Sequence, residues 1–237
     1  MPSATKAIIF DFDGTLFDTH DTIAHTLALT FSHLLPPSIT PPSRAAIAAS
    51  ISAGLSLPQT ITQLYPSSSH IPALDAALLD KFLATYRSLY KTYGTPLIKP
   101  FAHVHELLSD LRARSIPCAI LSNKGIAAVR DVLAAHHLSS LIELVVGDGE
   151  PAACPRKPDP GSWTMAIKPA FEQRAGVVGL QAEDVLVVGD TEADIRYAWK
   201  IGARSVWCSY GYGEQGKCRE LEPEFIVGSL DEVKGLL

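Results

Sequence analysis

Several aspartates of this chain stand directly after short apolar segments with the pattern of buried strands. Asp11 and Asp13 follow Ala7–Phe10, and Asp190 follows Val185–Val188. In an open parallel sheet, ligands bind in the crevice outside the carboxyl ends of the strands. Carboxylates gathered there repel one another unless a cation lies between them. Oxygen ligands with no histidine or cysteine nearby favour Mg²⁺ over zinc, so the sequence predicts a magnesium site.

A basic residue is expected to share this acidic crevice. Lys157, within Arg-Lys-Pro-Asp-Pro, is the candidate, and Lys124 is the alternative. Asp194 follows Asp190 by four residues, on a predicted helix. Asp194 either belongs to the site or is a first-turn acid favoured by the helix dipole.

Two further polar residues, Ser122 and Asn123, follow the apolar segment Cys118–Leu121. They have two interpretations that can hold together. In one, they face the same crevice as the aspartates. In the other, Ser122 caps the helix that contains Val129 and Val132, because serine is favoured at helix N-termini.

The elements that must position these residues alternate between strand and helix. Apolar runs without alternation are typical of strands that are covered on both faces, as in a parallel sheet. Such runs occur at 7–10, 118–121, 144–146 and 185–188, with a helix predicted at about 102–114. The predicted fold class is therefore α/β, with a Rossmann-like open parallel sheet and right-handed crossovers.

The stretch from Asp18 to Leu97 contains no buried-strand run. Helical spacing dominates there, and proline clusters separate the predicted helices. We expect an all-helical domain at residues 17–97, inserted into a core of residues 1–16 and 98–237. The alternative is that these helices are ordinary crossovers of a single domain.

Composition excludes several classes of protein. The chain has 237 residues, a net charge of −5 and 47% hydrophobic residues. The acidic balance argues against nucleic acid as the main partner, because phosphate binding needs a concentrated basic face. No apolar run reaches the roughly 18–20 residues of a membrane helix. The four cysteines form no C-x-x-C pair and no targeting segment is visible, so a cytoplasmic location is expected.

Four segments in order along the chain resemble the signatures of the haloacid dehalogenase (HAD) superfamily. They are Asp11–Asp18, Leu121–Lys124, Lys157–Pro160 and Val188–Asp194. The helical insertion after the first segment is similar to the cap of the phosphoglycolate phosphatase-like subgroup. A single D-x-D-G-T segment could arise by chance, whereas the ordered set of four is specific.

The resemblance implies roles for the acidic residues. Asp11 is the expected nucleophile, which attacks phosphorus and forms an aspartyl-phosphate. Asp13 is the expected general acid and base. Mg²⁺ is expected on the Asp11 carboxylate, the Asp13 backbone carbonyl and Asp190, with Asp194 supporting the metal.

The same resemblance implies a set of phosphate-binding residues: Gly14, Thr15, Ser122, Asn123 and Lys157. Lys157 is also expected to balance charge that develops on the phosphoryl oxygens. Gly14 and Thr15 are expected to form the turn that lets both acids of the first segment face the crevice.

The predicted function is a Mg²⁺-dependent phosphatase that hydrolyses a small phosphorylated metabolite. Asp13 argues against a dehalogenase, because halide leaves without a proton. The stretch Ala45–Leu74 has no lysine, which argues against the Schiff-base chemistry of phosphonoacetaldehyde hydrolases. A phosphosugar mutase and a catalytically silent HAD-like binding or regulatory module remain alternatives, and the oligomeric state is expected to be monomer or homodimer.

By the same resemblance, Ser52–Ser56 is the expected specificity loop of the predicted cap. It has no cation that could pair with a second anionic group. It therefore favours a neutral or apolar leaving group over phosphoglycolate, unless Arg44, Arg87 or a core residue supplies the charge.

Overall fold

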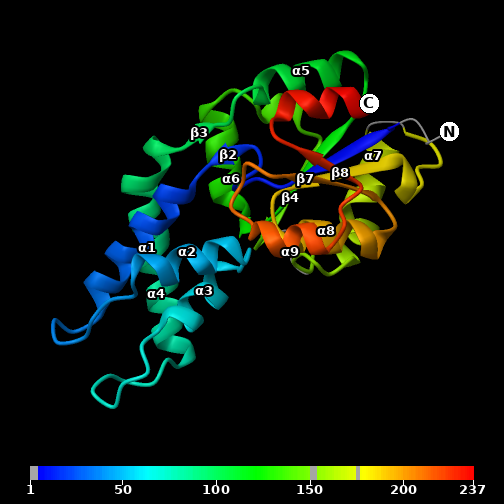
Figure 1. Ribbon diagram of the computed structural model, residues 1–237. Helices are drawn as coiled ribbons and strands as arrows, with labels where there is room; N and C mark the ends of the chain where they lie inside the picture. Colours follow the sequence, from blue (N-terminus) through cyan, green and yellow to red (C-terminus); the bar gives the residue numbers. More distant parts are fainter. Residues whose placement is uncertain (1–4, 150–153, 175–176) are drawn as a thin grey trace. The chain divides into compact units, whose positions relative to one another are not determined.

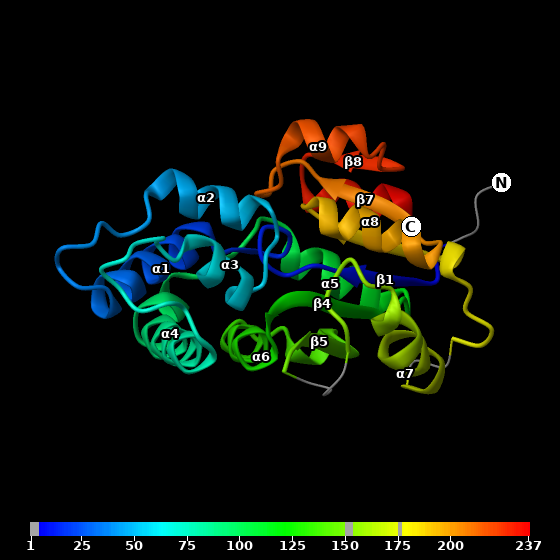
Figure 2. The same ribbon diagram turned by 90° about the horizontal axis from the view of Figure 1, so that it is seen from below.

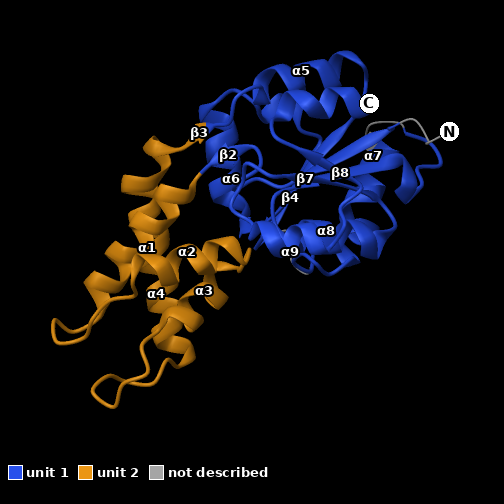
Figure 3. Ribbon diagram, in the orientation of Figure 1, with its two compact units in different colours: residues 1–18, 100–237 blue, residues 19–99 orange. Residues whose placement is uncertain are grey.

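The computed structural model describes residues 5–149, 154–174 and 177–237 (Figure 1). The chain divides into two compact units, one of residues 1–18 and 100–237 and one of residues 19–99 (Figure 3). The boundaries expected from the sequence, after residues 16 and 97, lie two residues before these on both sides of the insertion. We call the two parts unit 1 and unit 2.

Unit 1 contains a six-stranded sheet in which all neighbouring strands are parallel. Its order is β5-β4-β1-β6-β7-β8, and Figure 2 shows β1 beside β4 with β5 beyond it. The predicted α/β fold class is confirmed. The strands are β1 (Ala7–Phe10), β4 (Cys118–Gly125), β5 (Leu144–Asp148), β6 (Val185–Gly189), β7 (Arg204–Cys208) and β8 (Phe225–Val227). Two short strands, β2 (Phe17–Asp18) and β3 (Lys99–Pro100), form a separate two-stranded sheet.

The helices of unit 1 cover the sheet because its central strands are apolar on both faces. All four residues of β1 are fully buried. Ile9 and Val187 belong to a core cluster with Phe171 and Tyr197 from the helices. Figure 1 shows α5 on one side of the sheet and α8 on the other. The helices are α5 (Val104–Ala113), α6 (Ile126–Ala135), α7 (Lys168–Arg174), α8 (Glu192–Ile201) and α9 (Gln215–Glu220).

Unit 2 is built from helices, as expected for the insertion. They are α1 (His20–Leu34), α2 (Arg44–Ser52), α3 (Leu57–Leu64) and α4 (Ala76–Leu89), followed by a π-helical turn at Tyr90–Gly94 and a 3-10 turn at Thr95–Leu97. Its core includes Phe31 and Phe82, whose ring centroids lie 5.1 Å apart. Aromatic pairs at this separation stabilise a core beyond the apolar area that they bury.

All four cysteines are free thiols. Burial raises the pKa of Cys118 to about 12, with a smaller contribution from Glu143. A thiol with a raised pKa carries little of the reactive thiolate form. Among the described residues, every helix is too short or too polar to cross a membrane.

Candidate active site

The predicted site residues gather at the carboxyl ends of the three central strands of unit 1. Asp11 directly follows β1, Ser122–Lys124 form the end of β4, and Asp190 directly follows β6. β1 lies between β4 and β6 in the sheet. Parallel strands in this order bring their carboxyl ends to one edge, so residues far apart in the chain become neighbours.

Three carboxylates form a cluster at this edge. Asp11, Asp190 and Asp194 each offer one oxygen, and these oxygens all lie within 4.8 Å of one another. Asp190 and Asp194 are 0% and 2% exposed, respectively. Buried carboxylates at this separation need a cation or strong hydrogen bonds, because an unpaired buried charge is costly.

Lys157 supplies part of that compensation. Its Nζ lies 2.8 Å from Asp11 Oδ1 and 2.5 Å from Asp194 Oδ1, and its side chain is only 3% exposed. The sequence prediction that Lys157 shares the acidic edge therefore matches its position. A buried ion pair of this kind is strongly destabilised when one partner is removed.

Asn123 holds the backbone of Lys157. The Lys157 N–H donates to Asn123 Oδ1 at 3.0 Å, and Asn123 Nδ2 donates to the Lys157 carbonyl oxygen at 3.2 Å. Both ends of the Asn123 amide are thus engaged with one residue. The geometry indicates that this side chain orients Lys157, and its expected binding to phosphate stays a prediction.

Asp190 is held by donors from two distant segments. Thr15 Oγ1 donates to Asp190 Oδ1 at 3.0 Å, and the Tyr212 N–H donates to Asp190 Oδ2 at 2.7 Å. The Trp207 indole N–H donates to the Asp190 carbonyl oxygen at 2.9 Å. Thr15 is fully buried, so its hydroxyl group orients Asp190 and does not face solvent.

Asp194 has both of the roles that the sequence left open. Its Oδ2 accepts hydrogen bonds from Thr191 N–H at 3.0 Å and from Thr191 Oγ1 at 2.7 Å, which closes a capping box at the start of α8. Its Oδ1 pairs with Lys157. Asp194 therefore joins the helix terminus to the acidic cluster.

Asp13 has a different basic partner. Lys124 Nζ lies 2.9 Å from Asp13 Oδ1 and 3.2 Å from Asp13 Oδ2. The side chain of Asp13 is 21% exposed and that of Lys124 is 11% exposed. The two lysines that the sequence presented as alternatives thus serve different aspartates.

Gly14 forms the expected turn after Asp13. Its φ of +79° lies in the left-handed region, and its N–H donates to the Phe17 carbonyl oxygen at 2.9 Å. A Cβ atom at Gly14 would overlap the Asp190 carboxylate. Glycine therefore permits both the turn and the close approach of Asp190.

Ser122 lies in β4 and is buried. Its Oγ accepts a hydrogen bond from the Lys124 N–H at 3.2 Å, which leaves its own hydroxyl proton to donate. The alternative that Ser122 caps a helix is wrong. β4 continues to Gly125, and α6 begins at Ile126 with no side-chain cap.

Burial and mutual repulsion perturb the acidic residues. Burial, with smaller contributions from Asp194 and Asp13, raises the pKa of Asp11 to about 7, although Lys157 opposes this shift. Burial, followed by Asp11 and Asp194, raises the pKa of Asp190 well above its usual range. Burial would lower the pKa of Lys157, but its carboxylate partners raise it above its usual range. Lys157 is therefore fully charged at neutral pH.

We call six residues the acidic site: Asp11, Asp13, Asp190, Asp194, Lys124 and Lys157. With every member ionised its net charge is two negative units, which one divalent cation neutralises. The clustered ligand atoms are carboxylate oxygens, the donors that Mg²⁺ prefers. The donor set and its charge therefore fit a magnesium ion.

Sequence reasoning missed the loop that follows β7. Tyr210 OH donates to the Thr15 carbonyl oxygen at 2.8 Å, and Tyr212 OH donates to Asp18 Oδ1 at 2.9 Å. This loop has the sequence Tyr210-Gly211-Tyr212-Gly213. Its alternation of tyrosine and glycine is the signal for close packing against Asp190, since a Cβ at Gly211 or Gly213 would overlap that residue.

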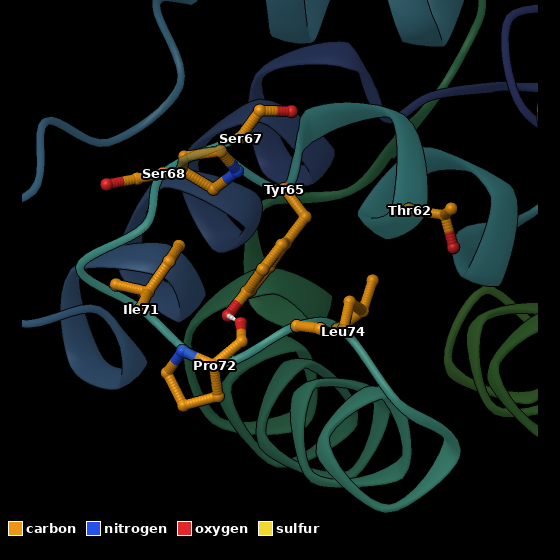
Figure 4. Close-up of a pocket in the computed structure, with 9 residues that line it drawn as sticks. Thr62, Tyr65, Ser67, Ser68, Ile71, Pro72 and Leu74 are labelled. Atoms are coloured by element: carbon orange, nitrogen blue, oxygen red, sulfur yellow. Dashed lines mark hydrogen bonds between the residues drawn. The ribbon is translucent and has the colours of Figure 1, made fainter.

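The expected specificity loop, residues 52–56, is partly committed to local structure in unit 2. The Ser56 hydroxyl donates to Gln59 Oε1 at 2.8 Å at the start of α3. A hollow of about 370 Å³ lies beyond the other end of α3 (Figure 4). Tyr65 crosses it and donates to the Pro72 carbonyl oxygen at 2.8 Å. None of the nine residues that line this hollow is charged, and none belongs to the expected loop.

Comparisons with known proteins agree with this geometry. The chain is similar to the phosphoglycolate phosphatase of Thiobacillus denitrificans, with 28% identity over 232 residues that cover 98% of this chain and 95% of the relative. It is also similar to the phosphoglycolate phosphatase of Neisseria meningitidis, with 24% identity over 232 residues, 96% of this chain and 92% of the relative.

A solved structure has the same fold. The crystal structure of a predicted phosphoglycolate phosphatase from Haemophilus somnus aligns with a TM-score of 0.80 at 22% identity, and covers 98% of this chain and 97% of that one. The family model described as haloacid dehalogenase-like hydrolase matches residues 8–208. The chain therefore belongs to the haloacid dehalogenase-like hydrolase family.

Proposed function

We propose that this hydrolase is a Mg²⁺-dependent phosphatase that acts on a small phosphomonoester through an aspartyl-phosphate on Asp11. The observation that carries this proposal is the position of Asp11. Its carboxylate lies at the end of the central strand, paired with Lys157 at 2.8 Å and clustered with Asp190. A nucleophile held beside a fixed cation and a metal site is the arrangement that phosphoryl transfer requires.

These residues would carry out the reaction in two chemical steps. In the first, an Asp11 oxygen forms a bond to phosphorus, the bond from phosphorus to the leaving oxygen breaks, and the Asp13 carboxyl group gives its proton to that oxygen. In the second, a water oxygen bonds to phosphorus, the Asp11–phosphorus bond breaks, and Asp13 takes a proton from the water. The products are the free alcohol and inorganic phosphate.

The other residues of the site hold charge and orientation. Lys157 balances the negative charge of the phosphoryl oxygens, and Ser122 has a hydroxyl proton for one of them. The Mg²⁺ ligands would be the Asp11 and Asp190 carboxylates and the Asp13 backbone carbonyl, with Asp194 in support. A bound Mg²⁺ supplies positive charge that stabilises phosphoryl oxygens. Gly14 forms the turn after Asp13. Thr15 orients Asp190, and Asn123 orients Lys157.

The helical unit 2 would serve as a cap domain, the role predicted for residues 17–97.

The similarity to relatives named phosphoglycolate phosphatases favours an acidic metabolite as the substrate of this chain. The uncharged loop at 52–56 favours a neutral leaving group instead.

A phosphosugar mutase is the second candidate, because both acids of the first signature are present. The silent module is disfavoured for the same reason. A cytoplasmic location and a monomeric or homodimeric state stay predictions.

A phosphomonoester panel with Mg²⁺ tests the proposal, with wild type compared with Asp11→Asn. The panel includes p-nitrophenyl phosphate, phosphoglycolate, neutral polyol phosphates and hexose phosphates. We expect phosphate release that requires Mg²⁺ and falls at least about 10³-fold in Asp11→Asn, because the covalent path is removed. An isomerised sugar phosphate without phosphate release would indicate the mutase. Inactive wild type, or an active Asp11→Asn variant, would contradict the proposed mechanism.

A further inference from the structure

The end of β4 is irregular at the residue that contacts Asp13. Leu121 lies opposite Val146 of β5, and the next pair joins Gly125 to Asp148. Four steps along β4 therefore match two steps along β5. Bulges of this kind redirect side chains and are frequent next to active sites. The two extra residues give β4 a local bulge that contains Lys124.

Gly147 of β5 makes room for this bulge. A Cβ atom at Gly147 would lie 2.7 Å from the Lys124 carbonyl oxygen and 3.1 Å from the Ile126 backbone nitrogen. Both neighbours are backbone atoms, which cannot move aside as the end of a flexible side chain can. The close approach of the two strands thus depends on glycine at this position.

The bulge directs the Lys124 ammonium group to Asp13. Lys124 Nζ contacts both carboxylate oxygens, at 2.9 and 3.2 Å. The lysine side chain is 11% exposed, and its Nζ lies 6.0 Å from the centroid of the buried Phe12 ring. Contacts to both oxygens restrict the rotation of a carboxylate more than a single contact does, so Lys124 limits the orientations of Asp13.

We propose that Lys124 is a positioning residue for Asp13, an inference that rests on the proposed function. Asp13 must reach the leaving oxygen in the first step and the attacking water in the second. Its side chain is partly exposed, so burial alone does not fix it. Lys124 keeps the carboxyl group at the edge of the sheet, where both transfers take place.

The test compares Lys124→Met with Lys124→Arg, and uses Lys200→Met on an exposed part of α8 as the matched control. First-turnover rates, kcat and KM are measured with p-nitrophenyl phosphate and with the best alkyl phosphate of the wild type. Nitrophenolate departs without a proton, whereas an alkoxide needs one. A misplaced general acid therefore lowers the rate of cleavage of the alkyl ester selectively.

We expect Lys124→Met to lower the first-turnover rate about 10- to 100-fold for the alkyl phosphate and at most about threefold for p-nitrophenyl phosphate. KM should stay unchanged, Lys124→Arg should recover part of the rate, and Lys200→Met should behave as wild type. In an Asp13→Asn background, Lys124→Met should cause no further loss of the first-turnover rate, because the two residues act as one unit.

Three results would overturn the inference. An equal loss with both esters and no recovery in Lys124→Arg would indicate a structural role only. Unchanged rates would exclude any role. A KM that rises only for substrates with an anionic leaving group would place Lys124 in substrate binding. If Lys124→Met does not fold, Lys124→Gln provides the same comparison. Failure of the proposed function itself is distinct, because the wild type would then release no phosphate.

Discussion

Five of the six residues of the acidic site have an opposite charge beside them. Lys157 lies between Asp11 and Asp194, and Lys124 contacts Asp13. Asp190 instead accepts hydrogen bonds from Thr15 and the Tyr212 N–H. Burial nevertheless raises the pKa of Asp11 to about 7. The chain alone therefore compensates the cluster only in part, and a divalent cation would complete the compensation.

This incomplete compensation of the carboxylates predicts how the effect of metal removal on stability depends on pH. The pKa of Asp11 is raised to about 7, and that of Asp190 is also raised. The metal-free folded state then binds more protons than the unfolded chain above the ordinary carboxyl pKa, so its stability falls as pH rises towards 7. Mg²⁺ removes this penalty. We expect EDTA to lower Tm more at about pH 8 than at about pH 5.

Thermal unfolding followed by circular dichroism, with Mg²⁺ and with EDTA, measures this difference. Asp190→Asn is the control, because one carboxylate fewer reduces the repulsion and should shrink the pH dependence. A Tm that responds equally to EDTA at both pH values would contradict the prediction.

At the scale of elements, the site depends on close backbone packing between segments that lie far apart in the chain. The loop after β7 places Gly211 against Asp190 and against the Gly14 carbonyl oxygen. Tyr212 adds an N–H donor to Asp190 and a hydroxyl contact to Asp18. The loop thus fixes a metal-ligand candidate, and it follows β7, which lies next to β6 in the sheet.

Gly211→Ala should displace Asp190, because the added Cβ would overlap the Asp190 side chain. We expect a loss of about 1–3 kcal/mol in the free energy of unfolding and a weaker affinity for Mg²⁺. Urea unfolding and calorimetric titration with Mg²⁺ measure the two effects. Gly235→Ala, where nothing lies within 4 Å of the added Cβ, is the matched control. Wild-type Mg²⁺ affinity in Gly211→Ala would show that the loop does not hold Asp190.

At the scale of the whole molecule, two units have separate cores. Unit 1 buries the faces of a parallel sheet, and unit 2 buries the inner faces of its helices. The chain crosses between them only twice, after Asp18 and before Pro100. Regions with separate cores unfold locally with different free energies. A substitution in one core should therefore lower the hydrogen-exchange protection of that unit alone.

Phe82→Ala should destabilise unit 2 selectively. Phe82 is 1% exposed and contacts the rings of Phe31 and Tyr65 at centroid distances of 5.1 and 5.7 Å. The expected cost is about 3–5 kcal/mol. Hydrogen exchange should show lost protection within residues 19–99 and unchanged protection in β1. Tyr93→Ala, at a residue 54% exposed in the same unit, should have little effect. Equal loss of protection in both units would indicate one cooperative structure.

Much of the fold could be predicted from local patterns. The runs at 7–10, 118–121, 144–146 and 185–188 became β1, β4, β5 and β6, because unbroken apolar segments suit strands that are buried on both faces. β7 and β8 were not predicted. β7 begins Arg-Ser and β8 has only three residues, so neither shows an apolar run of useful length.

The sequence by itself determined which residues are candidates for the chemistry, because Asp11, Asp13, Asp190 and Lys157 stand at strand ends or in short motifs that local chemistry makes recognisable. Only the tertiary structure decided which partner each one has. The Lys124–Asp13 contact spans 111 residues, and the Thr15–Asp190 contact spans 175. Such pairs depend on strand order, on a bulge and on close backbone packing, which arise when distant segments meet and leave no periodic pattern in the chain.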